Sequence, residues 1–170
     1  SFLDEVGDWR IVILSPFGAR VHAPWALLVA ARLRRDTDAE VDLMWTDDGI
    51  VFRIPESHDV PPLETFFPDA DDVEEELVRE IGHTALFAAK FRENAARSLL
   101  LPRRSPNKRT PLWLQRRRSG DLLSVAAKFH SFPMLMETYR ECLRDVFDMG
   151  GFQSLLKDVQ SRAIRIREVR

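Results

Sequence analysis

Two short segments with alternating apolar residues, separated by an Asp-Gly pair, constrain the fold of this chain more than any other feature. In residues 41–45, and again in residues 50–54, every second residue is apolar, which is typical of a half-buried strand. The pair Asp48-Gly49 lies between them and favours a two-residue turn of type I′, which requires positive φ angles. The sequence therefore predicts a β-hairpin and, with it, an antiparallel component of the sheet.

An almost wholly apolar segment precedes the hairpin. Residues 9–14 (WRIVIL) predict a central strand, which the Ser-Pro-Phe-Gly sequence at residues 15–18 ends. Residues 20–22 are predicted to be extended, and Pro24 to open a helix over about residues 25–35, since proline suits a first helical position. The order is then strand, helix, strand, strand.

The second half of the chain is mainly helical in pattern. A basic loop at residues 101–109 separates the earlier helices from a helix that begins at Thr110-Pro111, and Gly150-Gly151 is interpreted as a helix end. Residues 164–169 predict a last, charged edge strand. The predicted fold class is α+β, with a small antiparallel or mixed sheet of about four strands covered by a helical bundle. The predicted helices span residues 71–81, 84–100, 110–129, 131–149 and about 152–160.

Length and composition set limits on what the chain is. It has 170 residues, of which 45% are apolar and 31% charged, as in an ordinary globular protein. No run approaches the roughly 20 apolar residues of a membrane span, so we expect no membrane partner. The one cysteine, Cys142, excludes an internal disulfide and suits a reducing cytoplasm. The acidic start without Met predicts a single domain, residues 1–170, cut from a longer chain.

The net charge of −2 hides a strong asymmetry along the chain. Residues 36–80 contain sixteen acidic and two basic residues, whereas residues 90–118 contain ten basic residues and one acidic residue. Because phosphate binding depends on the local field, this distribution favours a nucleic-acid partner even at an overall pI near 6.1.

The residues offer little for catalysis. No Gly-rich turn ends in Gly-Lys-Ser/Thr, so an ATP site within the chain is not expected, and Ser15 lacks the Gly-x-Ser-x-Gly setting of a nucleophile. The prediction is therefore no catalytic residue, no metal and no cofactor in this chain, with Cys142 in the core. The candidates considered for a metal were His22, His58, His83, His130, Asp47 and Asp48, and none has ligand spacing.

The basic segment is the strongest candidate site. Its cations neutralise phosphates, and Trp113 between them offers a ring on which a base can stack, as single-strand binding requires. Two alternatives stay open: a solvated face, or arginines paired with the acidic segment at residues 36–80. Trp113 is equally compatible with a core position. The predicted contacts are Arg103, Arg104, Arg109, Trp113 and Arg116.

Arg20 and His22 form a second candidate. They flank Val21 before the predicted helix, and alternation would turn Val21 inward and the other two side chains outward. A helix N-terminus can bind anions, so nucleic-acid contact is one interpretation and a capping or surface role the other.

Several long motifs resemble one known family. The chain is similar to the DEAD/H-helicase-associated domain of the Lhr (large helicase-related) family over nearly its whole length. It departs from the expected pattern at residues 129–133 (FHSFP), a local loop change. The motifs are Gly7–Arg10, Ser15–Ala26, Thr46–Val51, Ala85–Arg97, Leu100–Arg104, Arg109–Trp113 and Tyr139–Val146.

The resemblance implies a setting for the chain. Lhr proteins are bacterial and archaeal ATP-dependent helicases associated with DNA repair, in which two RecA-like motor domains bind ATP and Mg²⁺ and a winged-helix domain follows. They move 3′ to 5′ along a single strand, so we expect this domain to bind single-stranded DNA or RNA, help to form the strand channel and brace the motor.

Two other interpretations remain. A scaffold would dock its basic arm on acidic surfaces of the motor or winged-helix domains without touching nucleic acid. A nuclease or hydrolase would be built on Asp47, Asp48 and His22. Salt-dependent strand binding would separate the first two, and metal-dependent cleavage would be needed for the third.

Overall fold

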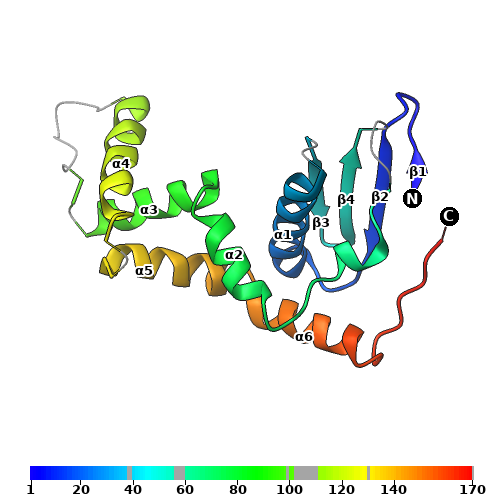
Figure 1. Cartoon of the computed structure of the whole chain (residues 1–170). Coiled ribbons are helices and arrows are strands. Elements are labelled where there is room, and N and C mark those ends of the chain that lie inside the picture. Colours follow the sequence, from blue (N-terminus) through cyan, green and yellow to red (C-terminus); the bar gives the residue numbers. More distant parts are fainter. Residues whose placement is uncertain (38–39, 56–59, 99, 102–110, 130, 170) are drawn as a thin grey trace. The chain divides into compact units, whose positions relative to one another are not determined.

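The computed structural model describes residues 1–37, 40–55, 60–98, 100–101, 111–129 and 131–169 (Figure 1). It divides the chain into two compact units. Unit 1 contains residues 1–80 and 147–170, and unit 2 contains residues 81–146. Each unit is described by itself. None of the described helices combines the length and the apolar character needed to cross a bilayer.

Unit 1 contains a four-stranded sheet in the order β1-β2-β4-β3, in which every pair is antiparallel. The predicted α+β class and the number of strands are confirmed. The strands are β1 (Phe2–Leu3), β2 (Trp9–Leu14), β3 (Asp42–Thr46) and β4 (Gly49–Ile54). The register places Ile11 opposite Phe52 and Ile13 opposite Ile50, so apolar side chains share one face.

Helix α1 (Ala19–Thr37) packs on β3 and β4, as Figure 1 shows. Trp25 of α1 is the centre of the core: its Nε1 donates to the carbonyl oxygen of Phe66 at 2.6 Å, and its ring stacks on Phe152 with centroids 6.0 Å apart. Burying an aromatic side chain of this size contributes strongly to core stability. The remaining elements of unit 1 are η1 (Leu63–Phe66), most of α2 (Val73–Ile81) and α6 (Met149–Gln160).

Unit 2 is helical. Helix α3 (Ala85–Arg97) buries Phe87, Phe91 and Ala95 and packs on α4 (Leu112–Ala126) and α5 (Pro133–Arg140). Cys142 is buried, which confirms its core position. Unit 2 also contains the π-helix η2 (Glu141–Val146).

The hairpin turn differs from the prediction. Its central residues are Asp47 and Asp48, because Thr46 is paired with Gly49, and neither aspartate has a positive φ, so the turn is not of type I′. Gly49 is the first residue of β4. A Cβ there would lie 2.1 Å from the carbonyl oxygen of Ile13, so the close approach of two backbones explains the glycine.

Three further predictions are wrong. Residues 20–22 are helical, since α1 begins at Ala19 and not near Trp25. The pair Gly150-Gly151 does not end a helix but lies in the first turn of α6. Residues 164–169 form no strand, and the fourth strand is β1 instead.

Candidate nucleic-acid interface

Helix α4 carries the part of the predicted site that the structure describes. Arg103, Arg104 and Arg109 lie outside the described residues. Trp113, in the first turn of α4, is 64% exposed, so the alternative that it belongs to the core is wrong. Arg116 and Arg117 are exposed as well, three and four residues further along the helix. Residues at this spacing share a helical face, so the indole and two guanidinium groups are presented together.

Buried residues fix α4 against the rest of unit 2. Ser119 is buried, and its Oγ donates to the carbonyl oxygen of Arg116 at 3.0 Å. Ala126 is buried at the end of the helix. The face with Trp113 and the arginines is thereby turned to solvent, because the opposite face packs on α3.

Three cations of unit 2 outside α4 are held by carboxylates. Lys90, Arg97 and Arg140 form ion pairs with Glu93, Glu141 and Glu137. These pairs have electrostatic consequences: the hydrogen bond from Arg140 lowers the pKa of Glu137, and the hydrogen bond to Glu93 raises the pKa of Lys90. Within the part of the chain that the structure describes, no such pair involves Arg116, Arg117 or Arg118.

The acidic segment at residues 36–80 finds partners within unit 1. Glu76 receives two hydrogen bonds from Arg32, at 2.6 and 2.9 Å, and Glu75 pairs with Arg79. Asp71 lies 3.7 Å from the Nζ of Lys157. Several carboxylates of the acidic segment therefore pair with cations of unit 1 itself.

The second candidate pair is split by the fold. Arg20 is exposed in the first turn of α1, but His22 is completely buried, so the prediction that its side chain points outward is wrong. The reason is the earlier start of α1, which replaces the two-residue alternation of a strand by a helical period. The Nδ1 of His22 lies 2.7 Å from the carbonyl oxygen of Thr46, and its Nε2 lies 2.9 Å from the Oγ of Ser15. Because a carbonyl only accepts, we assign the proton to Nδ1, and Ser15 then donates to Nε2.

Known proteins that are similar to this chain match it over nearly its whole length. The profile of one family, described as DEAD/H associated, matches residues 1–170. The chain belongs to the DEAD/H associated family. This confirms the resemblance stated from the motifs.

Curated relatives of this DEAD/H associated chain are Lhr helicases. It is 48% identical to the Lhr helicase/probable uracil glycosylase of Mycolicibacterium smegmatis, over 99% of this chain and 11% of the relative. It is 45% identical to the Lhr helicase/uracil glycosylase of Escherichia coli, again over 11% of that protein. The chain thus spans about a tenth of the length of these relatives.

One solved structure is similar throughout. The Mycobacterium smegmatis helicase Lhr bound to ssDNA and AMP-PNP matches with a TM-score of 0.88 and 47% identity, over 98% of this chain and 21% of that one. An archaeal relative, the ATP-dependent helicase Lhr-Core of Saccharolobus solfataricus, is 27% identical over 96% of this chain and 19% of its own length.

The acidic turn of this DEAD/H associated chain has a structural function that the sequence did not reveal. The Oδ1 of Asp47 accepts a hydrogen bond from the backbone N–H of Ala19 at 2.8 Å, so the hairpin turn caps the start of α1. The cap comes from a residue 28 positions away, so no local N-cap pattern could have indicated it.

No group of three His, Cys, Asp or Glu that could hold a metal occurs among the described residues.

Proposed function

We propose that this chain is an accessory nucleic-acid-binding module of an ATP-dependent 3′-to-5′ helicase. It helps to form the channel for the single strand and braces the motor. ATP and Mg²⁺ belong to RecA-like motor domains of the same polypeptide, next to a winged-helix domain, and the parent enzyme acts in DNA repair. This chain supplies no catalytic residue and no cofactor.

The exposed face of α4 is the observation that supports this proposal. Trp113 offers an aromatic surface for base stacking, and Arg116 and Arg117 lie beside it without an ion pair among the described residues. Base stacking on an aromatic side chain contributes about 1–3 kcal/mol per base, and unpaired cations bind phosphates without first breaking an ion pair. Arg103, Arg104 and Arg109 precede α4 in the sequence and extend the same contact in this proposal.

Single-stranded DNA is the preferred ligand, because a 47% identical structure was solved with ssDNA. RNA shares the phosphates and the stacking bases and is the second choice. In unit 1, Arg20 is an additional contact in this proposal. His22 has a structural role there, because both of its ring nitrogens are hydrogen-bonded and it holds the start of α1 to Thr46.

Fluorescence anisotropy of a labelled single strand tests the proposal. We expect Trp113→Ala combined with Arg116→Gln to weaken binding by about 30-fold or more, because one base no longer stacks and one phosphate is no longer neutralised. Arg140→Gln is the matched control: it removes the same charge from an exposed site in the same unit, but that arginine is engaged by Glu137. Equal effects of the two variants would show that only overall charge matters and would contradict a defined site on α4.

A scaffold role is the second candidate, and a specific observation favours it. Leu112, Val125 and Phe129 are each more than half exposed at or after α4, where a protein partner would cover them. In that case the folded chain would not bind a single strand even at low salt, and alanine at Arg103, Arg104 and Arg109 would leave the strand affinity of the intact helicase unchanged.

A further inference from the structure

The edge of the sheet in unit 1 is only partly covered. Strand β1 pairs with β2 at two positions, Phe2 with Arg10 and Leu3 with Trp9. Beyond Arg10, β2 continues to Leu14 while it pairs with β4 on its other side. Among the described strands none lies opposite this second half of β2 on its outer side.

The backbone of this half-strand directs hydrogen-bonding groups outward. The N–H of Ser15 donates to the carbonyl oxygen of Asp48 at 3.0 Å, which extends the ladder with the hairpin. Hydrogen-bonded pairs alternate along an antiparallel ladder, so the backbone N–H and C=O groups of Ile11 and Ile13 also point toward β4. The backbone N–H and C=O groups of Val12 and Leu14 therefore point away from β4. Such an edge is a template for another strand.

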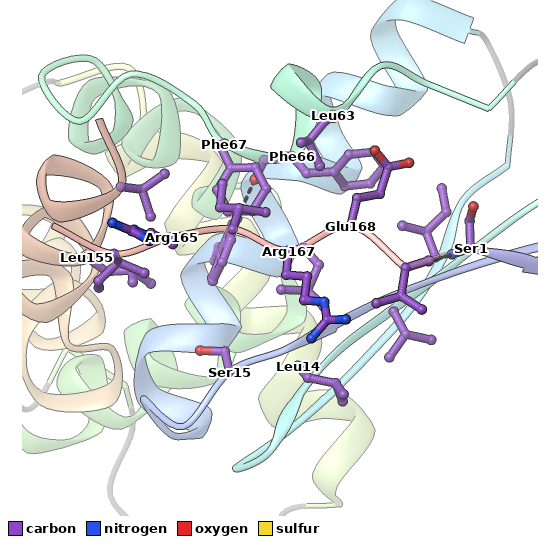
Figure 2. A pocket seen from close by; sticks show the side chains of 18 of the residues that line it. Ser1, Leu14, Ser15, Leu63, Phe66, Phe67, Leu155, Arg165, Arg167 and Glu168 are labelled. Carbon is purple, nitrogen blue, oxygen red and sulfur yellow. Dashed lines mark hydrogen bonds between the residues drawn. The ribbon is translucent and has the colours of Figure 1, made fainter. Parts of the chain in front are cut away.

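A cavity of about 450 Å³ lies beside the same edge. Its walls are β2, the segment from Leu63 to Phe67, and residues 164–169, as Figure 2 shows. Residues 164–169 are held at both ends: the N–H of Ile164 donates to Asp158 at 2.9 Å, and the N-terminal amine donates to the carbonyl oxygen of Val169 at 3.3 Å. Between these anchors they form no strand with β2, and the cavity occupies the gap.

The charged side chains that line the cavity are Arg165, Arg167 and Glu168, so cations outnumber carboxylates there. Figure 2 shows the guanidinium of Arg167 directed toward Leu14, at the open end of β2. Arg167 is exposed, and no acidic side chain in the described ranges forms an ion pair with it. Val12 and Leu14 are themselves exposed and apolar. An occupant with carboxylates next to apolar side chains would match both features.

We propose that the open half of β2 accepts an extended polypeptide strand with alternating apolar and acidic residues. The strand enters between β2 and residues 164–169 and becomes a neighbour of β2 beyond β1. Its backbone pairs with the outward groups of Val12 and Leu14, its apolar side chains fill the cavity, and a carboxylate meets Arg167. A peptide fits better than a nucleic acid, because the outward groups repeat every second residue with both donors and acceptors, as an added strand requires.

A labelled seven-residue peptide of alternating glutamate and valine tests this with the 170-residue chain. Two further peptides carry N-methyl groups, one on every valine amide and the other on every glutamate amide. All valine amides face one side of a strand and all glutamate amides the other, so one methylated peptide should bind at least tenfold more weakly while the other retains binding. Equal affinity of both methylated peptides, or no saturable binding of the parent peptide, would overturn the proposal.

Two readouts locate the peptide. Amide hydrogen exchange at Val12 and Leu14 should slow when the peptide binds, while Ile11 and Ile13 of the same strand, already paired with β4, serve as the internal control. Arg167→Glu should reverse the preference between the glutamate peptide and its lysine counterpart. Arg162→Glu, at an exposed arginine that does not line the cavity, should not. If instead a single-stranded oligonucleotide bound there and the peptides did not, the cavity would be a nucleic-acid-binding site and the proposal would be wrong.

Discussion

The junction at Asp148 shows how single residues hold unit 1 together. Its carboxylate caps α6 by accepting a hydrogen bond from the N–H of Gly151 at 2.9 Å. A Cβ on Gly151 would lie 2.7 Å from the other carboxylate oxygen, so the cap and the glycine depend on each other. The neighbouring Gly150 has no such restriction, because its Cβ would lie 3.9 Å from the nearest atom.

Gly151→Ala should therefore destabilise unit 1 by about 1 kcal/mol or more, the usual cost of losing an N-cap. Gly150→Ala is the matched control and should be neutral or stabilising, since alanine favours helix more than glycine does. Urea denaturation of the two variants measures the difference. Equal stability would mean that the cap contributes nothing.

The thiol of Cys142 gives a prediction that depends on pH. Burial raises its pKa from 9.0 to about 11, so the folded state retains a proton that the unfolded state releases earlier. The resulting stabilisation is complete below pH 9.0 and is lost as the pH rises toward about 11. Comparing urea denaturation of the parent and Cys142→Ala at pH 8, 9.5 and 11 isolates this contribution from other titrating groups. A stability difference that does not change over this range would contradict the shift.

At the scale of elements, a proline inside a helix joins α1 to α6. Pro24 has no N–H, so it cannot donate to the carbonyl oxygen of Arg20 four residues earlier. That oxygen instead accepts a hydrogen bond from the N–H of Asp148 at 3.0 Å. Because Pro24 cannot donate to it, the carbonyl oxygen of Arg20 accepts from Asp148 and so connects α1 to the start of α6.

Pro24→Ala should accordingly fail to give the stabilisation of about 3 kcal/mol that removing an interior proline usually brings. The new N–H and that of Asp148 would compete for one carbonyl oxygen. We expect faster hydrogen exchange at Asp148 and a change in unfolding free energy no larger than about 1 kcal/mol. A large stabilisation with unchanged exchange at Asp148 would show that this bond does not connect the helices.

At the scale of the whole molecule, the sequence predicted those elements whose signals are local. The hydrophobic period predicted the strand at Trp9–Leu14, the two hairpin strands and the helices after the acidic segment, although the turn type was wrong. The motifs indicated the family. The start of α1 depends on Asp47 and the burial of His22 on Thr46, which lie 28 and 24 residues away in the sequence. The sequence did not predict whether Trp113 is exposed, because its position in the helix is equally compatible with the core. Its exposure depends on how α4 packs in unit 2.

The uneven charge of the chain leads to a prediction about salt. Replacing Arg116, Arg117 and Arg118 together by glutamine should make the salt dependence of single-strand binding less steep by about 2 in the log–log slope, at roughly 0.7 for each phosphate that is no longer neutralised. Anisotropy titrations from low to physiological salt measure this slope. An unchanged slope would place the phosphates elsewhere, for instance on the segment that precedes α4.

The cap that Asp47 places on Ala19 also has a consequence for the order of folding. During synthesis the residues of α1 leave the ribosome before the hairpin exists, so the first turn of the helix must wait for both its cap and the partner of His22. We expect that turn to form late, after β3 and β4 have paired, while the rest of α1 forms earlier. Mutations at Asp47 would then mainly speed unfolding and leave the folding rate nearly unchanged, which is the behaviour of a contact made after the transition state.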